Sequence, residues 1–242
     1  MTIRWLQAVI DIPADRFTLA GDFWRKVSAS GFGQVHPEHD EFTHLVRPDG
    51  DMHLELQRTN DDHLGVHLDL LVDDIDTTAS RATELGARIL SNPGHAVLES
   101  PGGVVFCLVS FSGESKRATA IELPSAHAVD QICLDVPAEH FQDVVGFWSA
   151  FSGWEPNPQV RDEFCSFAQP SLLPLRLLVQ RLGPSDPSEG RAHVDISCGE
   201  GVEAVAARHA DLGATIVESR RYWTVMNDPA GMPYCLTRRQ PH

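Results

Sequence analysis

The chain has 242 residues, of which 42% are hydrophobic and 22% charged, a composition typical of soluble globular proteins with a sizeable core. Its formal net charge of −15 argues against nucleic acids and membrane surfaces as partners, because both carry negative charge. No apolar run approaches the roughly 20 residues of a membrane-spanning helix, and the N-terminus lacks the layout of a secretory signal.

The first predicted element is a strand over residues 3–12, where apolar side chains alternate along one face. A helix is expected to begin at Pro13 and Asp15, because large apolar residues then follow at helical spacing. Strands are predicted next around 42–47 and 52–58. We interpret this stretch as one βαβββ unit, of which this helix and these three strands are four of the five elements.

The same order restarts in the next stretch of sequence. A strand over 65–72 leads into a helix that begins at Asp74, and Gly86 ends that helix at a position suited to a left-handed cap. Further strands are predicted near 87–91, 95–99 and 103–109. The first part of the chain thus holds two βαβββ units in series.

The rest of the chain repeats this pattern almost residue for residue. The matching pairs are Gln7 with Gln131, Asp11 with Asp135, Phe17 with Phe141, Phe23-Trp24 with Phe147-Trp148, Glu41 with Glu163, Gln57 with Gln180, His67 with His193, Asp69 with Asp195, Leu85-Gly86 with Leu212-Gly213, and Cys107 with Cys235. The offset drifts by only a few residues, as loop insertions would cause. We therefore predict two tandem domains, residues 1–112 and 126–242, joined by a small, polar linker over 113–125.

The five cysteines are widely spaced and include no Cys-x-x-Cys pair. This spacing favours free thiols that pack as small hydrophobes over a disulfide framework or a structural zinc site. A reducing, cytoplasmic location is the simplest expectation.

Several motifs together resemble the vicinal-oxygen-chelate superfamily, which includes glyoxalase I, bleomycin-resistance proteins and extradiol dioxygenases. They are the Phe-Trp helices, the His-x-Asp strands, the Leu-Gly-Ala helix ends, and the ending from Asp228 to Leu236, Asp-Pro-Ala-Gly-Met-Pro-Tyr-Cys-Leu. The resemblance covers nearly the whole chain and is strongest to tandem glyoxalase-like proteins of actinobacterial type. It implies an α+β fold of four βαβββ units forming two domains, with curved mixed sheets and helices on the convex face. It does not imply one activity, because this fold hosts many chemistries.

Strand alternation places four polar side chains on the face opposite the apolar rows. If those rows pack on the helices, then Gln7, Glu55, His67 and Cys107 share the concave face. These are the four metal-ligand positions that the resemblance implies, with cysteine in place of the final glutamate. One divalent ion, Zn²⁺, Ni²⁺ or Fe²⁺, is chemically compatible with this set. The cysteine removes the carboxylate that resembles the general base of glyoxalase I, which argues against that activity.

The second copy has a poorer set of ligands. Gln131, His193 and Cys235 occupy the matching positions, but Leu178 replaces Glu55. Without a carboxylate this set would hold a divalent ion weakly. Any metal is therefore expected in the N-terminal domain.

Each candidate residue also has a purely structural interpretation. Histidines in positions like those of His67 and His193 are more often partly buried residues that are hydrogen-bonded to a neighbouring side chain than metal ligands. For Glu55, a solvated carboxylate on an edge strand is as good an interpretation as a role in a site. Asp69 and Asp195 are placed to orient the histidines or to face solvent. Trp5 lies by parity on the concave side, and Trp223 has a similar place in the second copy, so both are candidates for ligand contact.

Two hypotheses remain open. The first is a small-molecule-binding protein of the bleomycin-resistance type without a complete metal site, in which Trp5, Gln7, Asp69, Gln131, His193 and Trp223 contact the ligand. The second is a metal-dependent lyase, isomerase or dioxygenase, with Glu55 and His67 catalytic and the metal polarising vicinal oxygens of a substrate. A site assembled across the two domains is a further alternative, with Gln7 and Glu55 meeting His193 and Cys235. A tandem duplication is compatible with either a monomer or a homodimer.

Overall fold

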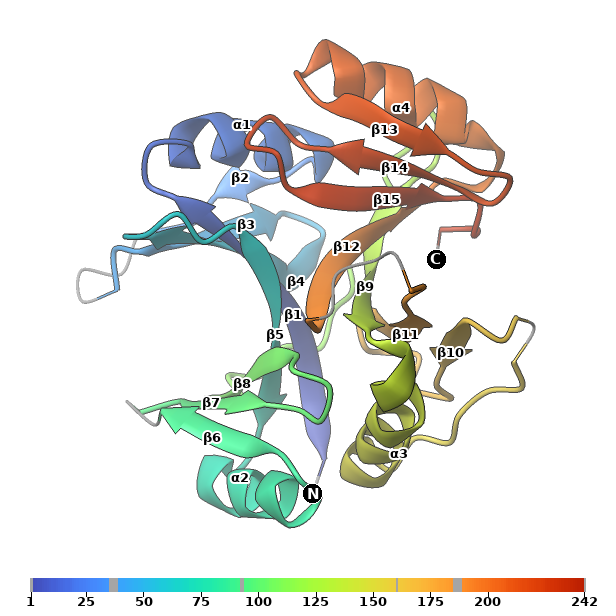
Figure 1. The fold of residues 1–242 in the computed structure, drawn as a ribbon. Coiled ribbons are helices and arrows are strands. Elements are labelled where there is room, and N and C mark those ends of the chain that lie inside the picture. Colours follow the sequence, from blue (N-terminus) through green and yellow to red (C-terminus); the bar gives the residue numbers. More distant parts are fainter. Residues whose placement is uncertain (1, 35–38, 92–93, 160, 185–188, 242) are drawn as a thin grey trace. The chain divides into compact units, whose positions relative to one another are not determined.

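A computed structural model describes residues 2–34, 39–91, 94–159, 161–184 and 189–241 (Figure 1). The first half contains β1 (Ile3–Pro13), α1 (Phe17–Val27), β2 (Gly31–Phe32), β3 (Phe42–Arg47), β4 (Gly50–Thr59), β5 (Gly65–Val72), α2 (Ile75–Glu84), β6 (Arg88–Ser91), β7 (Ala96–Glu99) and β8 (Val105–Ser110). The second half contains β9 (Ala128–Val136), α3 (Phe141–Ser152), β10 (Phe164–Ser166), β11 (Arg176–Arg181), β12 (Arg191–Ser197), α4 (Val202–Asp211), β13 (Thr215–Ser219), β14 (Trp223–Asn227) and β15 (Pro233–Thr237), with short 3₁₀ turns at Ala138–His140 and Gly199–Gly201.

The predicted βαβββ order is present in the first, second and fourth quarters of the chain. The third quarter differs, because its described residues after α3 form β10, β11 and only an isolated bridge between Pro156 and Phe167. Pro156 and Pro158 lie in that stretch, and a proline cannot donate to a ladder of hydrogen bonds. The βαβββ order predicts a further short strand between α3 and β10, and the prolines explain why only this bridge forms there among the described residues.

The strands form two mixed, curved sheets, which confirms the α+β fold class. The eight-stranded sheet has the order β2-β3-β4-β1-β5-β8-β7-β6, and the seven-stranded sheet has the order β10-β11-β9-β12-β15-β14-β13. In each half, the first and last strands of the second βαβββ unit are paired in parallel. These pairs are β5 with β8 and β12 with β15. Hairpin neighbours such as β3 and β4 are antiparallel.

Local signals set the ends of α2 as predicted. Asp74 accepts a hydrogen bond from the backbone N–H of Thr77 at 2.9 Å, and Gly86 has φ of 104°. Residues with a side chain are strained at such a φ, so glycine can end this helix without that strain. The first helix departs from its prediction: β1 continues through Pro13, and α1 begins only at Phe17.

The chain divides into two compact units that each take one quarter from either half. Unit 1 contains residues 1–8, 67–115 and 132–192, and unit 2 contains residues 9–66, 116–131 and 193–242. The domain boundaries at 112 and 126 stay a prediction about the sequence repeat. Within the described ranges, no helix has the length and apolar content needed to span a bilayer.

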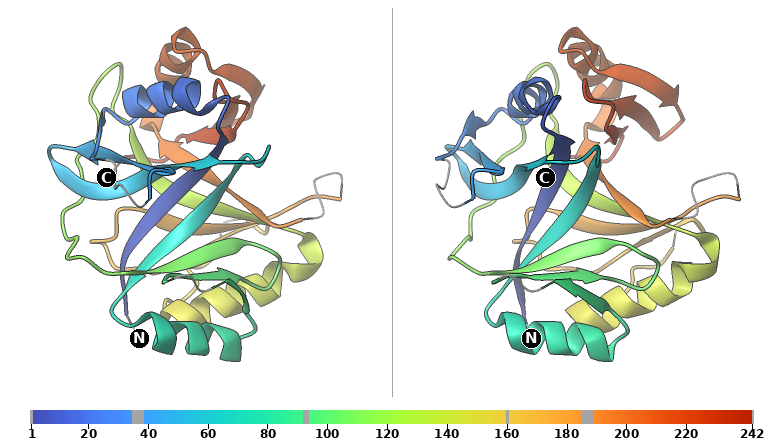
Figure 2. Two further views of the ribbon diagram at one scale, coloured as in Figure 1. Left: turned by 90° about the vertical axis from the view of Figure 1, so that its left-hand side faces the viewer. Right: turned by 60° about the vertical axis from the view of Figure 1, so that its left-hand side comes forward.

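The core of unit 1 joins the first helix of the second half to the last strand of the first half. Phe106 of β8 lies 5.3 Å from Trp148 and 5.8 Å from Phe151, measured between ring centroids, and both aromatic residues belong to α3. Figure 2 shows α3 (yellow) beside the strands β6 to β8 (green). The contact with Trp148 is edge-to-face, an arrangement that stabilises a core beyond simple area burial.

The core of unit 2 is the reciprocal arrangement. Trp24 of α1 contacts Tyr234 of β15 with ring centroids 5.3 Å apart, and Figure 1 shows α1 beside β14 and β15. His209 of α4 completes this core: its Nδ1 lies 2.9 Å from the hydroxyl of Tyr234. Burial lowers the pKa of His209 to about 3, so the ring is neutral in the folded protein at neutral pH.

Candidate functional site

The parallel pairing of β5 with β8 brings three of the predicted polar side chains together. Asp69 is the direct partner of Cys107, and His67 lies two residues before Asp69 on the same face. Their nearest ligand atoms all lie within 4.8 Å of one another, and His67 Nε2 is 3.5 Å from Asp69 Oδ1. We call His67, Asp69 and Cys107 the N-terminal cluster.

The second half forms an equivalent group. Asp195 of β12 is paired with Cys235 of β15, and His193 Nε2 lies 3.2 Å from Asp195 Oδ1 and 3.5 Å from Cys235 Sγ. We call His193, Asp195 and Cys235 the C-terminal cluster. The convergence of histidine and cysteine, expected from parity in both halves, is thus present.

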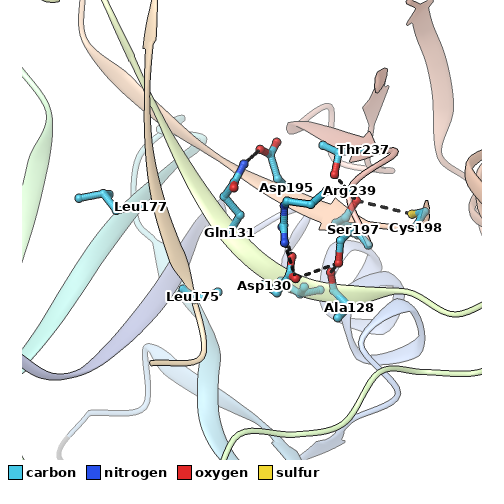
Figure 3. Close-up of polar contacts among 12 residues, drawn as sticks. Ala128, Asp130, Gln131, Leu175, Leu177, Asp195, Ser197, Cys198, Thr237 and Arg239 are labelled. Carbon is cyan, nitrogen blue, oxygen red and sulfur yellow. Dashed lines mark hydrogen bonds and ion pairs between the residues drawn. The ribbon is translucent and has the colours of Figure 1, made fainter. Parts of the chain in front are cut away.

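A glutamine side chain bonds to the C-terminal cluster. Gln131 of β9 donates from Nε2 to Asp195 Oδ2 over 2.5 Å, and Figure 3 shows the two side chains meeting across neighbouring strands. Both residues are buried, at 5% and 3% exposure. One carboxylate oxygen of Asp195 is therefore occupied by the glutamine, and the other faces the histidine.

The thiol in the N-terminal cluster is held in its neutral form. Burial raises the pKa of Cys107, and a hydrogen bond with His67 opposes this shift only in part. A metal ion binds the thiolate, so metal binding here would have to release the thiol proton. All five cysteines are free, and four are buried and one half-buried, which confirms their expected packing as small hydrophobes.

Glu55 is bound by a partner that the sequence did not indicate. His44 of β3 lies directly opposite Glu55 of β4, and its Nε2 is 2.7 Å from Glu55 Oε1. The hydrogen bond to Glu55 raises the pKa of His44. At the equivalent place in the second half, Ser166 faces Leu178, so this pair has no counterpart there. Hairpin register counted back from the turn would have missed His44, because an irregularity between Leu45 and Arg47 shifts the pairing by two residues.

The two tryptophans proposed as ligand contacts differ in exposure. Trp5 of β1 is buried, with 1% of its surface exposed. Trp223 opens β14, is half-buried, and has the guanidinium of Arg220 5.5 Å from its ring centroid. Gln7 is also buried, at 4% exposure.

The second half also contains a buried ion pair that the sequence analysis missed. Asp130 receives two hydrogen bonds from the guanidinium of Arg239, one of them from Nη1 at 2.8 Å, and a third from Ser197 Oγ at 2.9 Å (Figure 3). The sequence offered one signal. In the alignment of the two halves these residues stand opposite apolar Leu6, Leu71 and Phe111.

The donor chemistry of the two clusters does not fit a hard metal ion. Manganese prefers carboxylate, carbonyl and water oxygens, whereas each cluster offers one imidazole, one carboxylate and one thiol. Zinc accepts all three donor types, but requires the thiol to lose its proton. Among divalent ions, zinc is the one these residues would suit.

Comparisons with known proteins agree on the scaffold. The family model for the glyoxalase-like domain matches residues 7–109 and again residues 131–237. No curated protein matches the sequence significantly.

Solved structures share the fold at low sequence identity. The Mn(II)-bound glyoxalase from Novosphingobium aromaticivorans is 17% identical with a TM-score of 0.69, over 97% of this chain and 82% of that one. The 2,2',3-trihydroxybiphenyl 1,2-dioxygenase from Sphingomonas wittichii is 14% identical with a TM-score of 0.62, over 96% and 88%. A 2,3-dioxygenase from Pseudomonas sp. KL28 is 12% identical with a TM-score of 0.66, over 98% and 91%. At these identities the likeness shows the fold alone.

Proposed function

The chain belongs to the glyoxalase-like domain family, and we propose that it is a small-molecule-binding protein whose binding residues need no metal ion. The observation that carries this proposal is that polar side chains at the predicted ligand positions are already in contact with other side chains. Gln131 bonds to Asp195, Cys235 lies against His193, and Glu55 is held by His44. In a metal site, by contrast, the ligand nitrogen, oxygen and sulfur atoms point toward the ion and not toward one another.

Hydrogen-bonding side chains that neighbouring residues hold in place suit the recognition of organic ligands. Small-molecule sites combine apolar walls with a few placed hydrogen-bonding groups. In the first half we propose Trp5, Gln7 and Asp69 for this role, and in the second half Gln131, His193 and Trp223. Because Trp5 is 1% exposed, a ligand would reach it only after its neighbours move.

A thermal-shift screen of a chemically diverse compound panel tests this function. We expect ligands that raise the melting temperature of protein treated with EDTA as much as that of untreated protein, because binding alone stabilises the folded state. His193→Ala should weaken those ligands at least tenfold. Exposed His140, replaced by alanine, is the matched control. Stabilisation that disappears with EDTA would contradict the proposal.

A second candidate is the metal-dependent lyase, isomerase or dioxygenase. It is favoured by the N-terminal cluster, whose three donors lie within 4.8 Å of one another, and by the Mn(II)-bound glyoxalase among the similar structures. Gln7, Glu55, His67 and Cys107 would then hold the ion, which would supply Lewis-acid chemistry toward vicinal oxygens. The contact that Glu55 already makes with His44 makes this the weaker candidate. A cytoplasmic location and a monomeric or homodimeric state stay predictions.

A further inference from the structure

Two histidine rings pack against each other in the core of unit 2. His209 of α4 and His127, the residue before β9, are 1% and 3% exposed, and their ring centroids lie 6.3 Å apart. The ring of His209 also lies 5.7 Å from that of Tyr234 on β15 and 5.6 Å from that of Phe23 on α1. Because α4 packs on β13, β14 and β15 (Figure 1), His209 is enclosed by several elements of this unit.

The equivalent positions in unit 1 are apolar. The repeat aligns His127 with Ile3, His209 with Ala82, and Tyr234 with Phe106. These three residues of unit 1 are 5% exposed or less. The scaffold therefore does not require polar side chains here, and the two buried histidines are a property of unit 2.

The hydrogen bond between His209 and Tyr234 suits a neutral imidazole. His209 Nδ1 lies 2.9 Å from the Tyr234 hydroxyl. We assign the neutral tautomer with its hydrogen on Nε2, because Nδ1 then accepts the hydroxyl hydrogen. A protonated ring carries a hydrogen on both nitrogens, so the hydroxyl would have to accept and direct its own hydrogen elsewhere. Tyr234 is 0% exposed, so solvent does not offer that hydrogen an acceptor.

The surroundings of His209 disfavour a positive charge on its ring. Burial lowers the pKa of His209 to about 3, and repulsion from His127 and from Arg208 on the same helix contributes to this shift. From α1 the ring meets the apolar side chain of Phe23. A proton on His209 is therefore costly as long as this core stays packed.

Two acidic groups near this core act on Tyr234. Burial raises the pKa of Tyr234, and the charges of Asp228 and Cys198 raise it further. The oxygens of Asp228 accept hydrogen bonds from Trp24 and from backbone N–H groups of the turn before β15. This carboxylate thus already has hydrogen-bond donors of its own.

His127 is subject to the same cost of burial. Burial lowers the pKa of His127, hydrogen bonds with the carbonyls of Ser125 and Val27 oppose this shift, and the charge of Arg47 adds to it. Its Nδ1 lies 2.7 Å from the carbonyl oxygen of Ser125. A proton on either His127 or His209 would place a positive charge beside the other ring.

These shifts make unit 2 less stable in acid. In the unfolded chain a histidine takes up its proton at a pKa of about 6.5, whereas folded His209 resists protonation. The stability that depends on the neutral ring is therefore complete above about pH 6.5, and the folding equilibrium falls about tenfold for each pH unit from there toward about pH 3. Most carboxyl groups take up a proton below about pH 5, so the interval above that pH reports on histidines.

We propose that His127 and His209, together with Tyr234, form an acid-sensitive core that loosens unit 2 at a pH at which unit 1 stays folded. Unit 1 has Ile3 and Ala82 in place of the histidines, and neither can take up a proton. The C-terminal cluster belongs to unit 2 and would lose its arrangement at the same pH. This loosening needs no bound ligand, so it is independent of the proposed small-molecule binding.

Hydrogen–deuterium exchange of the intact protein tests this difference between the units. Exchange is read by mass spectrometry and corrected for the intrinsic exchange rate at each pH. Between pH 7 and pH 5 we expect the protection of α1, α4 and β15 in unit 2 to fall about 25-fold. The protection of α2 and β8 in unit 1 should change by less than about threefold. Equal losses in the two units would overturn the proposal.

Two variants remove the titrating group in different ways, so the test does not depend on one of them folding. His209→Gln keeps a side chain that can accept a hydrogen bond from Tyr234 but does not titrate. His209→Ala combined with Tyr234→Phe gives unit 2 the residues that unit 1 has at these positions. Either change should reduce the loss of protection in unit 2 to less than about fivefold, whereas His140→Ala, at an exposed histidine of unit 1, should leave it unchanged. A loss of about 25-fold that persists without His209 would contradict the proposed core.

Discussion

Replacing Asp130 with alanine is expected to lower the free energy of unfolding by about 3–5 kcal/mol, the usual cost of leaving a buried charge without its partner. The side chain of Asp130 is 4% exposed and that of Arg239 is 20% exposed, so water cannot compensate the guanidinium fully. Ser197 would lose this acceptor as well and would keep the longer bond to the carbonyl of Ala128 at 3.4 Å. Urea denaturation followed by circular dichroism measures this change.

A triple replacement separates the cost of breaking this network from its net contribution. The first half of the chain has Leu6, Leu71 and Phe111 at the three equivalent positions. Combining Asp130→Leu, Ser197→Leu and Arg239→Phe should therefore recover most of the stability that Asp130→Ala loses, because a buried ion pair is often no better than well-packed apolar side chains. A loss below about 1 kcal/mol for Asp130→Ala would contradict the buried, fully engaged state of this carboxylate.

Replacing Asp228 with alanine is expected to cost about 3 kcal/mol, because three buried donors would lose one acceptor. Asp228 Oδ2 accepts from Trp24 Nε1 at 2.8 Å, and Oδ1 accepts from the backbone N–H groups of Ala230 and Met232, each at 2.8 Å. Burial raises the pKa of the Asp228 carboxyl, and the hydrogen bonds from these donors oppose that shift because they stabilise the charged form. The bond to Trp24 also joins α1 of the first half to the last hairpin of the second half.

The equivalent residue in the other half is the matched control. Ser100 stands where Asp228 does, and its hydroxyl donates to the carbonyl of Val104 at 3.1 Å. Among the described residues, Trp148 Nε1 is buried without a hydrogen-bond partner. Ser100→Ala should therefore cost less than about 1 kcal/mol by thermal or urea denaturation. Equal losses from the two substitutions would contradict the special role assigned to Asp228.

Alternation and helical spacing were enough to predict most of the fold. They placed β5 and β8 within about two residues and put His67 and Cys107 on one face, where the structure brings them together with Asp69. Parity succeeds here because a regular strand directs successive side chains to opposite faces, and β5 and β8 pair without a register shift.

The partners of the buried faces could not be predicted in this way. The apolar stripe of α1 showed that Trp24 is buried, but not that it packs on Tyr234 more than 200 positions later. A hydrophobic pattern identifies the face that is buried and leaves open which element covers it. Alternation and helical spacing alone therefore did not show that the compact units mix the two halves, although a site assembled across the two domains was one of the open alternatives.

Buried polar pairs were missed for a related reason. Glu55 with His44 and Asp130 with Arg239 each join residues that look like ordinary charged positions when taken singly. Comparing the two halves position by position is the signal that would have found Asp130 and Arg239, since each stands opposite an apolar residue.

The metal content of the protein tests the central claim most directly. The protein should be purified without a metal-binding tag, incubated with Zn²⁺, desalted and analysed by elemental mass spectrometry. Metal-independent binding predicts less than about one tenth of an equivalent, with no difference between the native protein and His67→Ala. About one equivalent of zinc, lost in His67→Ala or Cys107→Ser but kept in His140→Ala, would contradict it and favour the metal-dependent enzyme.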